Sequence, residues 1–172
     1  MAAGPLDSPT MGPVATLPDF DLELSGGGRL RAADLRGRRG VLYFYPKDDT
    51  SGCTLEAREF TALGDDFSKA GVAVYGVSPD SAGSHDRFIA KCDLGIPLVA
   101  DPDRVLIGAF DLWKEKSLYG RTYMGVERST FLIGPDGTVE QEWRKVKVPG
   151  HAAEVLARAV RTPSVDDVAG AV

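Results

Sequence analysis

Cys53 stands where a sequence can make a thiol reactive. It follows the apolar run 41–45 through a loop that begins with Pro46, and it precedes a stretch with helical periodicity. The first turn of a helix has unpaired amide N–H groups and the positive end of the helix dipole, which favour an anion. The sequence therefore predicts a Cys53 thiolate, the nucleophilic form of cysteine.

Two further residues of the same loop fit such a site. Thr50 can turn its hydroxyl toward the sulfur, and Pro46 can shield one side from water without offering a competing donor. The same residues also fit an ordinary helix start, with Cys53 as a small apolar side chain and Thr50 as the N-cap. From residue types alone, both interpretations stay open.

Strands and helices must hold this loop in place. The apolar run 41–45 ends at Pro46 and predicts a strand that is covered on both faces, in the centre of a sheet. Apolar residues at three- and four-residue steps predict one helix of about five turns between Leu55 and Ala70, with Gly71 after its end. Cys53 then lies at the junction of a central strand and a helix.

The rest of the chain continues the alternation of strands and helices. A half-buried strand is expected at 20–24, before a glycine turn, and an irregular connection at 113–127. The other expected elements are strands at 72–77 and 97–100, helices at 81–93, 104–112 and 155–160, and a hairpin of 128–133 and 138–143 around Pro135-Asp136-Gly137. This order indicates an α/β fold with a mixed sheet between helices.

The other chemistry-bearing residues argue against several classes of protein. A thioredoxin-type disulfide oxidoreductase needs Cys-x-x-Cys, but Glu56 takes the second position. A cysteine hydrolase needs a histidine base beside Cys53, whereas His85 and His151 lie in polar helix starts and are expected on the surface. A closed zinc site would need both histidines and both cysteines, and no two of these share ligand spacing. A noncatalytic binding or chaperone domain also stays open.

Composition places the chain among globular proteins of one domain. It has 172 residues, 43% of them hydrophobic and 26% charged, and a net charge of -5 without a basic run, which argues against nucleic-acid binding. Its apolar runs are far shorter than the roughly 20 residues of a membrane span, and 1–16 lacks the features of a signal peptide. We expect a soluble cytoplasmic protein with flexible tails at 1–16 and 163–172 and one domain at 17–162.

The Cys53 loop and segments far from it resemble one known family. Pro46-x-x-x-Thr50-x-x-Cys53 matches the peroxiredoxin active-site motif, and Tyr-Phe-Tyr-Pro-Lys with Gly-Cys-Thr resembles the peroxiredoxin Q group, also called bacterioferritin comigratory proteins. Segments between 114 and 137 are similar to the C-terminal half of that group, so the resemblance covers about 17–160. It implies a thioredoxin-like three-layer sandwich with a mixed central sheet and an N-terminal β extension.

The resemblance also implies an activity, the thiol-dependent reduction of hydroperoxides without a metal or organic cofactor. Cys53 would attack the terminal oxygen of hydrogen peroxide or an organic hydroperoxide and become a sulfenic acid. Arg128 is by this likeness the arginine that faces the cysteine, although its sequence position alone favours a solvated side chain. Together with Thr50 and Pro46 it would orient the peroxide and stabilise the departing oxygen. We expect Glu56 to stabilise the helix start, with a hydrogen bond to Arg128 as the alternative.

The second cysteine departs from the commonest pattern of this group. Many members carry it five residues after the first, where this chain has Arg58. Others carry it in the helix after the second core strand, where Cys92 and, one turn earlier, Ile89 both fit. We predict that Cys92 resolves Cys53 as a disulfide after local unwinding, since linked Cα atoms lie within about 7 Å. A packing role for Cys92, with an external thiol as resolving group, is the alternative. The resemblance further implies a monomer that thioredoxin recycles in antioxidant defence.

Overall fold

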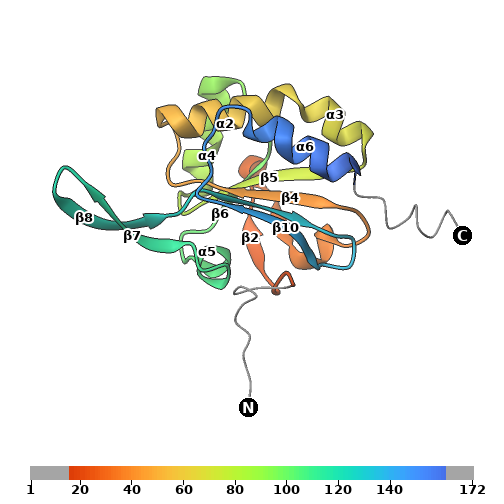
Figure 1. Ribbon diagram of the computed structural model, residues 1–172, viewed down its shortest axis with the longest axis horizontal. Helices are drawn as coiled ribbons and strands as arrows, with labels where there is room; N and C mark the ends of the chain where they lie inside the picture. Colours follow the sequence, from red (N-terminus) through yellow and green to blue (C-terminus); the bar gives the residue numbers. More distant parts are fainter. Residues whose placement is uncertain (1–15, 162–172) are drawn as a thin grey trace, which may run out of the picture.

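A five-stranded mixed sheet forms the middle of the computed structural model, which describes residues 16–161 (Figure 1). Its order is β10-β9-β4-β5-β6, with β4, β5 and β6 parallel and β9 antiparallel to both β4 and β10. The bounds are β4 Gly40–Phe44, β5 Ala73–Ser78, β6 Leu98–Ala100, β9 Ser129–Ile133 and β10 Val139–Arg144. The prediction of a central strand at 41–45 is confirmed. Apart from Thr16, both predicted tails lie outside the described residues.

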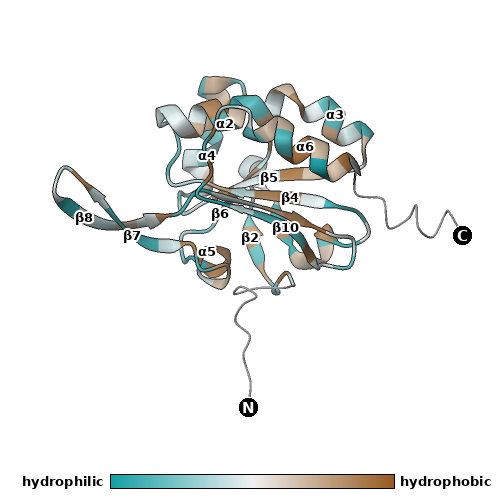
Figure 2. Cartoon of the chain, viewed as in Figure 1, coloured by the Kyte–Doolittle hydropathy of each residue, from teal (hydrophilic) through white to brown (hydrophobic). Residues whose placement is uncertain are grey.

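β4 is covered on both faces because its side chains alternate between two apolar cores. Val41 and Tyr43 belong to one core, and Leu42 and Phe44 belong to the other. All four residues have 0% exposure. Figure 2 shows hydrophobic residues along β4 and β5 between the layers. This burial fixes the end of β4, where the loop to Cys53 begins.

Helices cover one face of the sheet, and a helix with the N-terminal segments covers the other (Figure 1). The first face carries α2 Ser51–Ala62, α3 Gly64–Lys69, α4 Ala82–Cys92 and α6 His151–Arg161. The second carries α5 Val105–Ala109, the 3-10 helix η2 Ala32–Leu35, and the hairpin of β2 Asp21–Glu23 and β3 Arg29–Arg31, which includes the 3-10 helix η1 Ser25–Gly27. The predicted three-layer sandwich with an N-terminal β extension is confirmed. No helix within 16–161 has the length and apolar character needed to cross a membrane.

The predicted single helix from Leu55 to Ala70 is wrong, because the chain breaks it into α2 and α3. Leu63 leaves helical geometry with φ of -98° and ψ of 7°. Gly64 follows, and glycine is a weak helix former. Leu55, which the periodicity placed on the buried face, is 42% exposed.

The predicted irregular connection at 113–127 is also wrong, because most of it forms a hairpin of β7 Trp113–Leu118 and β8 Arg121–Val126. Tyr119 and Gly120 make its two-residue turn with φ of 52° and 79°, the positive values that such turns require. Most of its side chains are exposed, so no alternation of apolar residues marks the strands. In Figure 1 the hairpin extends away from the sheet, and its end leads into Arg128.

Candidate active site

Cys53 lies in the first turn of α2, one short loop after the central strand. Cys53 is only 1% exposed and belongs to the apolar core between the sheet and the helices. Thr50 occupies the N-cap position, but its hydroxyl donates to the carbonyl of Lys47 at 3.0 Å and makes no hydrogen bond to the helix. Thr50 is thus the N-cap residue by position, but its side chain does not cap the helix. Pro46, which is partly buried, begins the same loop.

Arg128 reaches the sulfur from the other half of the chain. Its Nη2 lies 3.4 Å from Cys53 Sγ, and its Nη1 donates to Glu56 Oε1 at 2.7 Å. The residue sits between β8 and β9, where its carbonyl accepts a hydrogen bond from Val146 N at 3.0 Å. The side chain is 18% exposed, so it is not the solvated arginine that sequence position favours. A cation thus touches both the thiol and a carboxylate.

Gly52 makes this approach possible. A Cβ atom at this position would lie 3.2 Å from Arg128 Nη2, closer than an ordinary van der Waals contact. The glycine before Cys53 therefore leaves room for the guanidinium above the first turn of α2.

Glu56 does not act as a helix-start carboxylate, which corrects the expectation from sequence. It lies beyond the first turn of α2, is 1% exposed and bonds Arg128. Burial raises the pKa of Glu56 to about 7, against the opposing attraction of Arg128. Among the described residues its second oxygen, Oε2, has no hydrogen-bond partner, which agrees with a proton on this carboxyl.

The guanidinium itself stays charged at this site. Burial works to lower the pKa of Arg128, but its two acidic neighbours Glu56 and Cys53 outweigh burial and raise it. Arg128 is therefore a permanent cation that two acidic groups share. When Glu56 holds its proton, the full charge of the guanidinium is available to Cys53.

Sequence reasoning missed two residues near this centre. Lys116 of β7 has a lowered pKa because of burial and of the neighbouring Arg128, while Cys53 opposes the shift. Tyr43 of β4 has a pKa raised well above its usual value by burial and by the nearby Glu56 and Cys53. The alternation along 41–45 could have placed Tyr43 on the Cys53 face, whereas nothing in the exposed hairpin sequence indicates Lys116.

Cys92 lies at the last residue of α4 and is buried in the same apolar core as Cys53. Both cysteines are free thiols. The neighbouring Lys91 donates to Asp49 of the Cys53 loop at 2.7 Å, so an ion pair connects the end of α4 to that loop.

Both histidines are buried, so the prediction that they lie on the surface is wrong. His85 has 0% exposure and contacts Asp48, and His151 contacts Thr130 Oγ1 at 2.8 Å through Nε2. Their sequence neighbours are polar, but their partners come from distant segments. The spacing of His85 with Phe88 and Cys92, which are buried on the same helix, was the available signal.

The fold and this site define a class of protein: thiol-based redox enzymes with a thioredoxin-like sandwich and an arginine on a cysteine at a helix start. The profile of the AhpC/TSA family matches residues 14–142. Peroxiredoxin Bcp of Xanthomonas campestris is 53% identical over 145 residues, 84% of this chain and 90% of that protein. Peroxiredoxin Bcp of Bacillus subtilis is 46% identical over 139 residues, 81% of this chain and 88% of that protein.

Solved structures agree with these relatives. Xanthomonas campestris peroxiredoxin Q matches with a TM-score of 0.78 and 50% identity, over 84% of this chain and 96% of that chain. The chain belongs to the AhpC/TSA family. Its resemblance to the peroxiredoxin Q group is confirmed, and it is a thiol-dependent peroxidase.

Proposed function

We propose that this peroxidase reduces hydrogen peroxide and organic hydroperoxides through a sulfenic acid on Cys53. The thiolate attacks the terminal peroxide oxygen, the O–O bond breaks, and the departing oxygen takes its electron pair and a proton to leave as water or an alcohol. The observation that carries the proposal is the Arg128 Nη2 at 3.4 Å from Cys53 Sγ. One solved Xanthomonas campestris relative is described by its alkyl peroxide reduction activity, which supports organic substrates.

The neighbouring residues have distinct roles in this proposal. Arg128 holds the thiolate ionised and stabilises the negative charge on the departing oxygen. Thr50 would offer its hydroxyl to the peroxide from the N-cap position of α2, and Pro46 closes the loop without adding a donor. Glu56 fixes one edge of the guanidinium at 2.7 Å, so the other edge faces the sulfur. The chemistry is positioning and electrostatics at one sulfur atom.

Cys92 is the resolving residue in this proposal. Its thiolate attacks the sulfenic sulfur of Cys53, hydroxide leaves and takes a proton to become water, and a disulfide forms. A dithiol reductant, thioredoxin in our proposal, then reduces the disulfide. Two solved structures of Xanthomonas campestris peroxiredoxin Q are mutants of two different cysteines, which lie 36 positions apart in that relative, whereas Cys53 and Cys92 lie 39 apart.

We expect the ends of two helices to open for this step, because both thiols are free and buried in the structure. Asp93 caps α4 in the left-handed region with φ of 55°, and Asp49 has φ of 63° in the loop before α2. Among the polar side-chain contacts of the described residues, only the exposed Lys91–Asp49 ion pair connects these two ends, and exposed pairs contribute little stability. The last turn of α4 is therefore the segment that we expect to unwind.

Intact mass after one equivalent of peroxide tests both parts of the proposal. Wild type should lose two hydrogens, Cys92→Ser should gain one oxygen, and Cys53→Ser should stay unchanged. Peroxide consumption by Cys53→Ser at more than about a tenth of wild type, far above what an un-ionised hydroxyl supports, would contradict the role of Cys53. A Cys92→Ser variant that turns over normally with a thioredoxin system would make this a one-cysteine enzyme.

The cytoplasmic location, monomeric state and role in antioxidant defence belong to the same proposal.

A further inference from the structure

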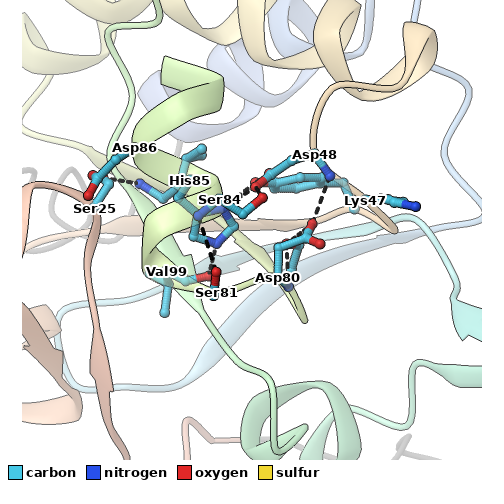
Figure 3. Close-up of polar contacts among 12 residues, drawn as sticks. Ser25, Lys47, Asp48, Asp80, Ser81, Ser84, His85, Asp86 and Val99 are labelled. Carbon is cyan, nitrogen blue, oxygen red and sulfur yellow. Dashed lines mark hydrogen bonds and ion pairs between the residues drawn. The ribbon is translucent and has the colours of Figure 1, made fainter. Parts of the chain in front are cut away.

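Asp48, in the loop between Pro46 and Thr50, is the centre of a second buried polar cluster (Figure 3). Its Oδ1 accepts a hydrogen bond from the Tyr45 hydroxyl at 2.7 Å. Its Oδ2 accepts one from Ser84 Oγ at 2.7 Å and lies 2.8 Å from His85 Nδ1. One carboxylate thus joins the end of β4 to the first turns of α4.

The partners of His85 determine its protonation. Nε2 lies 2.9 Å from the carbonyl oxygen of Val99, which can only accept, so this nitrogen carries a proton. Nδ1 faces Asp48, whose pKa is lowered because hydrogen bonds from His85, Tyr45 and Ser84 outweigh the effect of burial. An ionised Asp48 also only accepts. Each ring nitrogen of His85, which has 0% exposure, thus faces an oxygen that can accept a hydrogen bond.

The backbone amide of Asp48 is also held in place. Asp48 N donates to Asp80 Oδ2 at 2.7 Å, and that oxygen also accepts a hydrogen bond from Ser78 Oγ at 2.9 Å. Asp48 is thus fixed at its amide by the end of β5 and at its carboxylate by α4. Buried networks in which each member is bonded restrict a loop to one conformation.

Asp48 lies between the two residues that set the course of the loop into Thr50 and α2. Lys47 supplies the carbonyl that orients the Thr50 hydroxyl at 3.0 Å, and Asp49 turns the chain through the left-handed region into α2. A shift of Asp48 would move both of its neighbours, and with them the Thr50 hydroxyl. The position of that hydroxyl therefore depends on the hydrogen-bonded contact between Asp48 and His85, which does not involve Cys53.

We propose that His85 and Asp48 form a buried imidazolium–carboxylate pair that fixes the loop carrying Thr50, which makes His85 a positioning residue for the attack of Cys53 on peroxide. The inference rests on the proposed function, because it assigns Thr50 to the peroxide. The positioning role of His85 differs from a purely structural role in one respect. Loss of the pair should slow the reaction of Cys53 with peroxide more than other reactions of the same thiol.

The decisive measurement compares two second-order rate constants of Cys53, one with hydrogen peroxide and one with iodoacetamide. Alkylation needs the thiolate but no oriented peroxide. His85→Phe should lower the peroxide constant by about 10- to 100-fold through misplaced groups, while the alkylation constant stays near wild type. Equal changes in both constants, or none, would overturn the proposal. Ile107→Val, in the core on the other face of the sheet, is the control for a small loss of packing.

Two further variants keep the test independent of folding. In Asp48→Asn the amide can donate to a neutral His85 and accept from Tyr45, so the peroxide constant should stay within a few-fold of wild type. The double variant His85→Phe with Asp48→Asn buries no charge at these two positions, but it lacks the contact between residues 48 and 85. The folded double variant should therefore react with peroxide as slowly as His85→Phe. A double variant with the wild-type peroxide constant would overturn the proposal.

The protonation state is tested directly. Nitrogen-15 NMR of labelled histidine should show both His85 nitrogens protonated at neutral pH in wild type and one protonated in Asp48→Asn. A single neutral tautomer in wild type would overturn the ion pair. Failure of the proposed function looks different, because wild type itself would then be alkylated yet leave peroxide unchanged, and that result overturns both.

Discussion

The two buried charged clusters on either side of Thr50 differ in how completely their polar atoms are bonded. Around Asp48, both carboxylate oxygens and both nitrogens of His85 have partners. Around Cys53, one oxygen of Glu56 has no partner among the described residues, and Arg128 remains 18% exposed. The first arrangement suits a structural support, whereas in the second the partly exposed guanidinium of Arg128 stays accessible to a substrate.

The clusters also differ in their balance of charge. Asp48 and His85 neutralise each other one to one, at the 2.8 Å of a charge-assisted hydrogen bond. Arg128 instead serves two acidic groups, and Lys116 adds a partly buried cation nearby. An excess of positive charge favours the thiolate before reaction and the departing oxygen during it.

Among the variants that test this difference between the clusters, Arg128→Ala should slow the peroxide reaction most. Arg128→Ala leaves Cys53 without its fixed cation, so the rate constant with hydrogen peroxide should fall about 10²- to 10³-fold. Stopped-flow peroxide kinetics measure it, and the alkylation rate at neutral pH should fall as well because less thiolate is present.

Arg39→Ala is the matched control for this variant. Arg39 is also a partly buried arginine bonded to a glutamate, Glu140, at 2.8 Å. It lies at the start of β4, away from the Cys53 loop. If the two variants slow the peroxide reaction equally, Arg128 contributes only to the fold.

Glu56→Gln tests whether this carboxyl is neutral near pH 7. The folded-state pKa of Glu56 is about 7, above its ordinary value of 4.5, so the folded protein binds more protons between these values. Its contribution to stability is therefore fully present below about pH 4.5 and is lost as the pH rises through 7. Between these limits wild type should lose up to about 3 kcal/mol that the glutamine variant keeps.

Urea unfolding of both proteins from pH 5 to 8 measures this difference. Glu59→Gln, a substitution on the same helix whose carboxylate accepts from Gly150 N at 3.2 Å, should keep the wild-type slope. Parallel curves for wild type and Glu56→Gln would mean that Glu56 is ionised throughout this range and that Arg128 prevails over burial.

The sequence predicted those parts of the fold in which burial repeats along the chain. The strand at 41–45 has that signal, the hairpin around Pro135-Asp136-Gly137 has the signal of its turn residues instead, and both are present. The hairpin β7–β8 was missed because its side chains are largely exposed. Glu56 and His85 were misjudged because their partners are Arg128 and Asp48, 72 and 37 residues away, and local periodicity does not report such pairs. Without the resemblance to a family, Arg128 had no signal at all.

Gly52→Ala should give the smallest effect and tests how closely the guanidinium must approach the sulfur. The added Cβ would meet Arg128 Nη2 at 3.2 Å and displace it by a few tenths of an ångström, which should slow the peroxide reaction roughly two- to fivefold. Alanine within a helix is more stable than glycine by about 0.5–1 kcal/mol, so the free energy of unfolding should rise or stay constant.

Gly64→Ala is the control, because a Cβ at this position meets nothing within 4 Å. Its free energy of unfolding should rise without a change in the rate of the peroxide reaction. Activity and stability that move in opposite directions only at Gly52 would identify the contact between Arg128 and the start of α2 as functional. A Gly52→Ala enzyme with the wild-type rate would mean that the guanidinium has room to spare, and that the thiolate tolerates a longer distance than 3.4 Å.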